Sequence, residues 1–389
     1  MPSPPRFFLR LFRWFCRPEL RIPIEGDIVE LYLERVREKG KKRADLHFMK
    51  DVLLLFRKDI IRPLDGTFKL NRYGMLKNDI KTSLRTMKRE KLYTFVNGIG
   101  LLSGFVLAIL ILIYVRFEQS YEHYNPTSER VVRITMDYLD GETLIDQDCE
   151  TYHNLGPMIK DEFPEVVEFA RAFDFELSLE IDGKTFKEPT AYAVDPSFLK
   201  MLGHPLLLGD AANALEEPNH MVLTTSTAKK FFGTTDVIGK IIPNGNNSLK
   251  VVGVVADSPP NTHLKFNVLV SYSYMEDDIK KREDPWDSND TFTYLELGSS
   301  DQYSLFQQHL KDLSNRLREL DHIPDERIVS EKILDIHLYS NKSYEPEQNG
   351  SATTVFLLLG VALLVILIAI LNYINLSTAK ALDRAKEVG

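Results

Sequence analysis

The chain has 389 residues, 44% of them hydrophobic, and a formal net charge of −8, so its length allows two or three domains. Its two cysteines exclude a disulfide framework and any metal site built on paired cysteines. The average hydrophobic fraction conceals a strong segregation, because two long segments of the chain are almost wholly apolar.

The N-terminal region predicts a small cytoplasmic helical prefix domain, residues 1–70. "RFFLRLFRWFCR" places four arginines on one helical stripe among aromatic residues, which suits a helix in the membrane interface or one packed on the prefix. "GDIVELYLERVREKG" predicts a helix ending at Gly40. "RADLHFMKDVLLLFRKDII" predicts a second helix, ended by Arg62 and Pro63. We expect a structural or regulatory role for this bundle.

Two uncharged apolar segments predict membrane spans. Residues 71–93 predict a basic amphipathic elbow helix, which leads into a first span over 94–115. The second span is predicted over 355–374, before a short charged segment, 375–389. Spans of this length are about 30 Å long, which matches the hydrocarbon core of a bilayer. The alternative is a buried core helix, but such helices rarely run this far without a polar face.

Charge predicts how these spans are oriented. Residues 1–93 carry 23 Lys and Arg against 12 Asp and Glu, whereas the whole chain has 48 against 56. Because cytoplasmic flanks are rich in Lys and Arg, we expect both ends inside and residues 116–354 outside. On this topology Cys16 and Cys149 lie on opposite sides of the membrane and cannot pair within one chain.

The external region predicts an α+β domain, in two subdomains. "RVVRITMDY" and "LKVVGVVADS" predict strands, whereas "YHNLGPMIKDEF", "DPSFLKML" and "TTSTAKKFFG" predict short helices. A longer helix is predicted for "DQYSLFQQHLKDLSNRLREL", whose apolar stripe is Leu305, Phe306, Leu310, Leu313 and Leu317. The expected fold class is therefore a membrane protein with two transmembrane α-helices, a large α+β extracytoplasmic domain between them, and a small helical cytoplasmic prefix.

The sequence lacks the motifs of the common catalytic sites. "DGKT" and "GTTDVIGK" lack the glycine spacing of an ATP-binding loop, so we expect no ATP hydrolysis by this chain. His204, His220 and His263 have no partner at metal-ligand spacing, which favours structural roles. The serine of "GLLSG" lies inside the first span and not in a nucleophile elbow. We predict no catalytic residue and no metal site.

Small residues in the spans predict where helices pack closely. Gly100 and Gly104 form a GxxxG pair in the first span, which allows close approach of another helix. Its partner could be the second span, another copy of the chain, or spans outside this sequence. Gly360 in the second span is a further packing candidate, although its neighbour Ala362 does not repeat the GxxxG spacing.

Several stretches, in the right order, resemble one family. "MLKNDIKTSLRTMKREKLYTFVNGIGLLSGFVLAILILIYV" resembles the elbow and first span of FtsX-like/MacB-like ABC transporter permeases. "VLTTSTAKKFFG", "DVIGK" and "VVGVVADSPPNTHLKFNVLVS" are similar to their periplasmic core domain, and "ILDIHLYS" to its return strand. "LNYINLSTAKALDRAKEVG" resembles their second span and the start of the coupling segment. The N-terminal region resembles a prefix domain found on a subset of these permeases.

The resemblance implies a permease subunit of an ABC transporter of the mechanotransmission type, in the cell inner membrane. The permease itself is not an enzyme and holds no cofactor. A separate cytoplasmic ATPase, acting as a dimer, uses ATP and Mg, and its movement reaches the periplasmic domain for export or extraction of a substrate. Other implied partners are a second permease half or copy, a periplasmic or outer-membrane protein and membrane lipid, but no nucleic acid.

The C-terminal segment is expected to contact the ATPase. We predict that Asp383, Arg384, Lys386 and Glu387 form the docking surface, the alternative being a solvated helix end. Family members run on into further spans, so we expect the sequence to be truncated after the second transmembrane helix. The competing hypothesis is a two-span membrane receptor with an extracytoplasmic ligand-sensing domain. A membrane-anchored external enzyme ranks last. No residue signature identifies a transported substrate.

Overall fold

The computed structural model describes residues 3–57, 60, 77, 80–81, 84–85, 88, 91–211, 213–245, 247–275 and 284–388. It divides into two compact units, Met1–Val96 and Asn97–Gly389, and each is described by itself. The predicted elbow helix, residues 71–93, lies mostly outside the described residues.

The prefix is a bundle of three helices around an aromatic core. Its helices are α1 (Arg6–Phe15), α2 (Pro18–Lys39) and α3 (Lys41–Leu54). The buried core consists of Phe12, Phe15, Cys16, Ile28, Tyr32, Ala44, Phe48 and Val52. Helix α1 therefore packs on the prefix through its inner face, while Phe7 and Trp14 remain more than two-thirds exposed. Membrane contact by this exposed aromatic face stays a prediction.

The prefix helices differ from the predicted ones at their ends. Helix α2 begins at Pro18, because the fixed φ of proline suits the first helical turn, and the predicted start at Gly26 is wrong. It ends as predicted at Gly40, whose φ of 79° lies in the left-handed region that glycine adopts without strain. Helix α3 ends at Leu54, well before Arg62.

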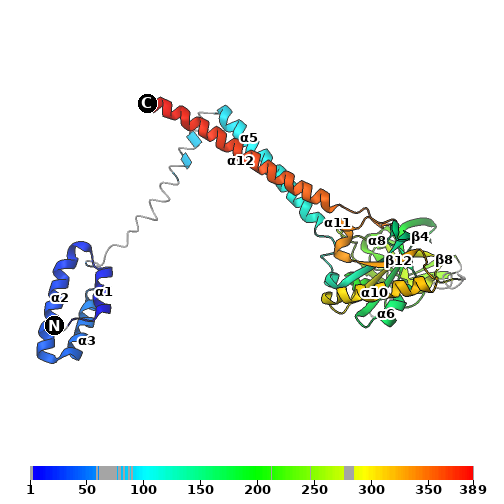
Figure 1. Ribbon diagram of the computed structural model, residues 1–389, viewed down its shortest axis with the longest axis horizontal. Coiled ribbons are helices and arrows are strands. Elements are labelled where there is room, and N and C mark those ends of the chain that lie inside the picture. Colours follow the sequence, from blue (N-terminus) through cyan, green and yellow to red (C-terminus); the bar gives the residue numbers. More distant parts are fainter. Residues whose placement is uncertain are drawn as a thin grey trace. The chain divides into compact units, whose positions relative to one another are not determined.

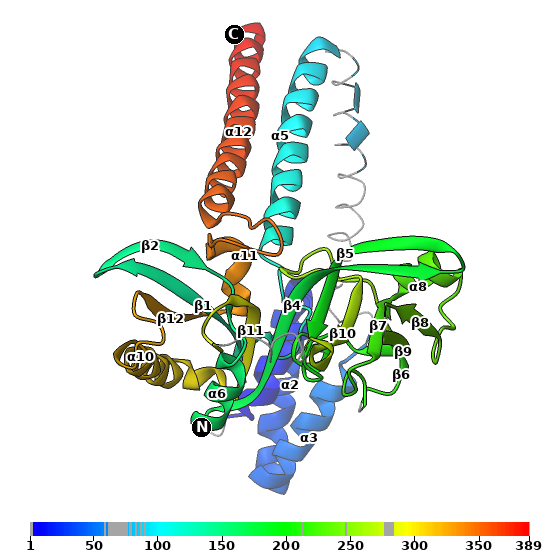
Figure 2. The same ribbon diagram turned by 90° about the vertical axis from the view of Figure 1, so that its right-hand side faces the viewer.

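Two long apolar helices run side by side in both ribbon views (Figures 1 and 2). They are α5 (Lys91–Glu118) and α12 (Ala352–Val388). Their candidate spans, Thr94–Glu118 and Ala352–Asn375, have mean hydropathies of 2.6 and 3.2 and extend a few residues beyond the predicted ones. Covered positions recur at three- and four-residue steps: Asn97, Leu101, Gly104, Ala108, Ile111 and Val115 on α5, and Val355, Leu358, Ala362, Val365, Ala369 and Asn372 on α12. This period of about 3.5 residues is typical of two helices packed along a left-handed seam.

The external domain is built on a mixed sheet of 12 strands among the described residues, in the order β12-β1-β11-β4-β5-β10-β7-β9-β6, with β2, β3 and β8 beside β1, β11 and β9. Pairs β5–β10 and β7–β9 are parallel and the other pairs are antiparallel. The strands are β1 (Val131–Asp140), β2 (Thr143–Asp148), β3 (Thr151–Tyr152), β4 (Val166–Ile181), β5 (Lys184–Val194), β6 (Leu206–Gly209), β7 (His220–Thr224), β8 (Ile241–Asn244), β9 (Asn247–Val255), β10 (Val268–Ser271), β11 (Asn289–Leu297) and β12 (Glu326–Lys332).

Short helices cover the two ends of this sheet, with α6 and α10 at one end and α8 at the other (Figure 2). The external helices are α6 (Leu155–Glu162), α7 (Phe198–Met201), α8 (Thr225–Phe232), α10 (Tyr303–Glu319) and α11 (Ile336–Tyr339). Helix α10 buries Phe306, Leu310, Leu313, Ser314 and Leu317 against the sheet. Leu305, predicted in that stripe, is instead 45% exposed. The sheet and its helices give the domain the predicted α+β class.

One predicted strand is helical. The segment "ILDIHLYS" forms a 3₁₀ turn, Ile333–Asp335, followed by α11, and the return strand is the preceding β12. Ile333 and Ile336 are both buried, and their three-residue spacing puts them on one face of a helical turn. A strand would have pointed them to opposite faces of the sheet.

Candidate functional site at the ends of the two spans

Buried polar side chains gather where α5 and α12 meet the external domain. One group, here called the α5 junction, consists of Glu118, Tyr121, Glu122, His263 and His337. A second group, the Arg133 cluster, consists of Arg133, Glu331, Ser340, Lys342 and Glu345. Apolar cores rarely hold charged side chains unless these are paired, so the charged side chains of both clusters are expected to have partners.

Glu122 anchors the segment that leaves α5. Its carboxylate accepts the main-chain N–H of His263 at 2.7 Å and lies 2.8 Å from Nδ1 of the same residue. The other ring nitrogen of His263 lies 2.8 Å from the hydroxyl of Tyr294 on β11. Glu122 adopts a φ of 61°, a conformation that costs a residue with a Cβ free energy, so the surrounding contacts hold it there.

The electrostatics of Glu122 favour its charged form. The carboxylate is 1% exposed, and burial alone would raise its pKa. The charge of His263 and the hydrogen bonds from its ring and main chain outweigh burial, so the pKa of Glu122 is lowered below its ordinary value. The imidazole and main chain of His263 are therefore the partners of a buried carboxylate, and their loss would leave that carboxylate uncompensated.

The last turn of α5 also contacts the chain that enters α12. Glu118 lies 2.9 Å from Nε2 of His337, and the ring of Tyr121 stacks on that imidazole with 3.3 Å between centroids. Gly350, just before α12, is held against the same pair, because a Cβ there would lie 2.5 Å from Glu118 and 2.8 Å from His337. A side chain at this position would therefore displace Glu118 or His337 from their contact.

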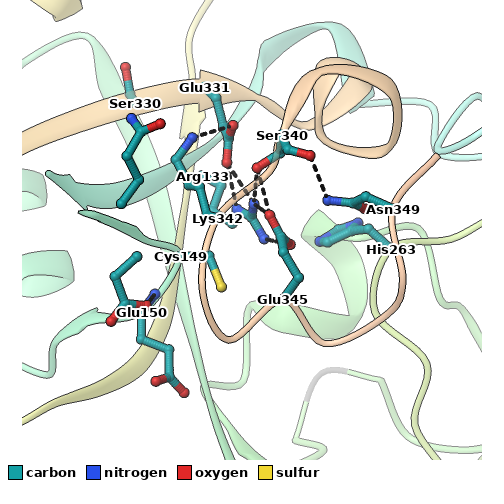
Figure 3. A network of polar contacts seen from close by, with 12 residues as sticks. Arg133, Cys149, Glu150, His263, Ser330, Glu331, Ser340, Lys342, Glu345 and Asn349 are labelled. Atoms are coloured by element: carbon teal, nitrogen blue, oxygen red, sulfur yellow. Dashed lines mark hydrogen bonds and ion pairs between the residues drawn. The ribbon is translucent and has the colours of Figure 1, made fainter. Parts of the chain in front are cut away.

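Arg133 is the centre of the second group, as Figure 3 shows. Its side chain is fully buried on β1. The guanidinium donates to Glu331 on β12 at 2.6 and 3.0 Å and to both carboxylate oxygens of Glu345 at 2.7 and 2.8 Å. It also donates to the Ser340 hydroxyl at 3.2 Å, and Lys342 donates to Glu331 at 3.0 Å. Two carboxylates thus face two cations.

The charges of the Arg133 cluster hold one another ionised. Burial alone would raise the pKa of Glu345, but the hydrogen bond and charge of Arg133 outweigh it and the pKa is lowered. Burial would also lower the pKa of Arg133, yet both glutamates raise it overall. Close by, burial raises the pKa of the Cys149 thiol, whose Sγ donates to the Ser343 carbonyl at 3.2 Å. This cysteine is therefore a packed thiol and not an activated nucleophile.

The two groups meet in the sheet. Strands β1 and β11 are antiparallel neighbours, and Arg133 is paired across them with Tyr294. Hydrogen bonds thus lead from Glu122 through His263 to Tyr294, and the strand register places Tyr294 beside Arg133. From there they reach the segment before α12, where Asn349 donates to the Ser340 carbonyl at 3.2 Å. The arrangement links the ends of both apolar helices to two neighbouring strands of the sheet.

The predicted span glycines lie in different surroundings. A Cβ on Gly100 would lie 3.1 Å from the amide of Asn372, and one on Gly104 would lie 3.0 Å from Cβ of Ala369. Both glycines thus face α12. Gly360 makes no such approach, since no atom of the described residues would lie within 4 Å of its Cβ. The small residues that face α5 are Ala362 and Ala369, and their seven-residue spacing was the missed signal.

Replacing Gly104 by leucine is expected to push α12 away from α5. The new side chain would collide with Ala369 and Val365, and a loss of about 1 kcal/mol of pairing lowers the paired population about fivefold. Cross-linking between Gly100→Cys and Asn372→Cys in membranes measures the pairing. Gly360→Leu is the matched control and should leave the yield unchanged. Equal yields in both backgrounds would contradict this contact.

The predicted coupling residues Asp383, Arg384, Lys386 and Glu387 belong to the C-terminal part of α12, and their side chains lie outside the described residues. The residues of the α5 junction and the Arg133 cluster were not predicted as a site. His263 was assigned a structural role because its partner Glu122 lies 141 positions away in sequence. No local spacing signals such a contact, and the hint in the sequence was an arginine in a strand that is mostly apolar.

Comparisons with known proteins agree with this architecture. Residues 94–313 match the family model described as "MacB-like periplasmic core domain". Among curated proteins, no significant match to the chain was found. A domain assigned to a permease protein from Porphyromonas gingivalis is 19% identical, with a TM-score of 0.45 over 53% of this chain and 89% of that one.

Two further solved structures are similar. The periplasmic region of MacB from Actinobacillus actinomycetemcomitans is 15% identical, with a TM-score of 0.37 over 51% of this chain and 88% of that one. The extracellular domain of the noncanonic ABC-type transporter YknZ from Gram-positive bacteria is 14% identical, with a TM-score of 0.37 over 51% and 99%. The family model covers more than half of the sequence, and the chain therefore belongs to the MacB-like permease family, with a periplasmic core domain between two membrane-spanning helices.

Proposed function

We propose that the chain is the permease subunit of a mechanotransmission ABC transporter and passes movement from a separate cytoplasmic ATPase to its periplasmic domain. The observation that carries the proposal is the pair of buried polar groups that fasten the two span ends to the neighbouring strands β11 and β1. Contacts of this kind hold a helix end and a sheet as one body, so displacement of a span displaces the sheet.

The interiors of the spans support the same role. Neither apolar segment, 94–115 or 355–374, contains an ionisable Asp, Glu, Lys, Arg or His, and such residues usually mark a substrate or ion pathway through the membrane. Instead the two helices are packed along a seam of small residues, including Gly104 and Ala369. A tight pair without a polar lining suits the transfer of movement better than permeation.

On this proposal the C-terminal part of α12 receives the movement. Asp383, Arg384, Lys386 and Glu387 would bind the ATPase dimer, which uses ATP and Mg, while the prefix and the N-terminus lie on the same cytoplasmic side. The periplasmic domain would act on a substrate for export or extraction. The chain itself would remain non-catalytic, and a second permease half or copy would complete the transporter.

An affinity capture with an ATP photoprobe tests the proposal. The full chain, tagged within its external domain, is isolated from its own cells in mild detergent and exposed to 8-azido-ATP. We expect a second, labelled chain whose recovery falls about tenfold in the double variant Asp383→Lys with Glu387→Lys, because a loss of about 1.4 kcal/mol of binding is tenfold. The matched control is Glu319→Lys with Asp321→Lys on the exposed end of α10. Absence of any ATP-labelled partner would overturn the proposal.

A further inference from the structure

A cavity of about 530 Å³ opens beside the segment that follows α5. Its size falls within the range of about 300–1,000 Å³ in which proteins hold small ligands. Three prolines, two leucines, a glycine and an alanine form most of its wall, and the polar part consists of Tyr124, Lys200 and His204. None of these residues belongs to the α5 junction or to the Arg133 cluster.

The cavity lies close to the membrane end of the domain. Tyr124 follows Glu118, the last residue of α5, by six positions, and six residues span at most about 20 Å. The opposite wall is fastened to this exit segment, because Asn125 donates to the Met201 carbonyl at 2.9 Å and Thr127 donates to the same oxygen at 2.8 Å. Any occupant of the cavity is therefore within reach of the bilayer surface.

The lining selects for an aliphatic body and a negative head. Leucine and proline side chains present apolar surface, and Lys200 is the only charged residue among those that line the cavity. Burial lowers the pKa of His204 to about 4, so its imidazole is neutral at physiological pH and lies 3.3 Å from the Tyr124 hydroxyl. Among the described residues that line the cavity, the polar wall thus carries one positive charge, at an exposed position, and no carboxylate.

We propose that this cavity binds one aliphatic chain of an anionic amphiphile, with the chain against Leu199 and the prolines and the anionic head beside Lys200. Two sources supply this chemistry: an anionic phospholipid of the adjoining leaflet, and a free fatty acid. Binding at this site does not depend on the transporter proposal, since it can be measured without ATP or an ATPase.

The site is one residue away from the α5 junction. The Tyr124 hydroxyl donates to Thr262 at 3.2 Å, and the next residue, His263, holds the Glu122 carboxylate. An amphiphile that displaces Tyr124 therefore acts on the loop that fastens α5 to the sheet. This places the cavity where an occupant can change how firmly the first span is attached.

Photolabelling of the full chain in phosphatidylcholine nanodiscs tests the site. The probe is palmitic acid with a diazirine on its chain, and labelled peptides are identified by mass spectrometry. We expect label in the peptide that contains Leu199 and Lys200, besides label in the spans. Ala211→Trp, at the exposed rim, should fill the cavity and lower that label at least fivefold. Leu305→Trp, exposed on α10, is the control and should change nothing.

The charge of the head is tested by a second pair of probes. Lys200→Glu should lower labelling by the acid at least fivefold and leave labelling by the matching diazirine hexadecanol unchanged. Discs that contain diazirine phosphatidylglycerol then separate the sources: label from this lipid assigns the leaflet, and label from the acid alone assigns a free fatty acid. Label confined to the spans would overturn the proposal. Cavity label that survives Ala211→Trp would also overturn it, provided that native hydrogen exchange in β1 shows the variant to be folded.

Discussion

Replacing Arg133 by methionine is expected to lower the free energy of unfolding of the external domain by about 3–5 kcal/mol, because the change removes the guanidinium shared by two buried carboxylates and leaves them only Lys342 and Ser340. The side chains of Glu331 and Glu345 are only 15% and 10% exposed, and both accept hydrogen bonds from the guanidinium. Methionine fills a similar volume, so lost charge and not a cavity accounts for the effect. Hydrogen exchange of peptides from β1 and β12, in the full chain in nanodiscs, measures the loss.

Two further variants show whether charge is the cause. Arg316→Met removes an ion pair to Glu162 in which the side chains are 51% and 39% exposed, so the loss should stay below about 1 kcal/mol. Combining Arg133→Met with Glu331→Gln and Glu345→Gln removes the uncompensated charges and should restore most of the protection. Equal losses in the Arg133 and Arg316 variants would contradict a buried charge cluster.

Helices could be predicted where their signals, such as caps or an uncharged apolar run, lie in the local sequence. Helix α8 combines a threonine N-cap at Thr224 with a C-terminal Gly233 in the left-handed region, and both signals lie within the helix and its flanks. The spans follow from their uncharged length alone. These predictions succeed because the physical cause, a cap or an apolar run, lies within about thirty residues of the chain.

Strand β1 illustrates why the site could not be predicted in the same way. Its first seven residues are all buried, so the usual alternation between a covered and a solvated face is absent. The loop of residues 340–349 contributes to this cover, and its contact with β1 joins Arg133 to Glu345 across 212 positions. An arginine in such a strand is compatible with burial only if its partners are known. Those partners come from parts of the sequence that no local pattern connects.

The same argument applies to the predicted return strand. The resemblance implied a strand for the segment "ILDIHLYS", and Ile333, Ile336 and Tyr339 are residue types that favour strands. Tertiary contacts favour a helical turn instead. The turn points His337 toward Glu118 and Tyr121, which it contacts. It also keeps Ile333 and Ile336 buried. The strand propensity of eight residues contributes less to the free energy of folding than the pairing of a buried histidine with the end of a span.

Replacing His263 by alanine is expected to uncouple the first span from the sheet. The change removes the imidazole that faces the buried Glu122 carboxylate, a loss of up to about 3–5 kcal/mol at the junction, and leaves only the main-chain N–H of residue 263 as its donor there. It also removes the contact to Tyr294. In the complex of chain and ATPase, binding of a non-hydrolysable ATP analogue should change hydrogen exchange in α5 and in β11 of the native protein. In the variant, the change should persist in α5 and disappear from β11.

His220→Ala is the matched control, because this histidine is half-buried at the start of β7 and its imidazole accepts only a long contact of 3.4 Å from the main chain of Glu217. It should leave the response of β11 to nucleotide intact. Glu122→Gln separates the pair from the packing of the ring, since the amide retains the shape of the side chain but loses its charge. If β11 still responds in both His263→Ala and Glu122→Gln, movement reaches the sheet by another route. The Arg133 cluster, which fastens the segment before α12, would then carry it alone.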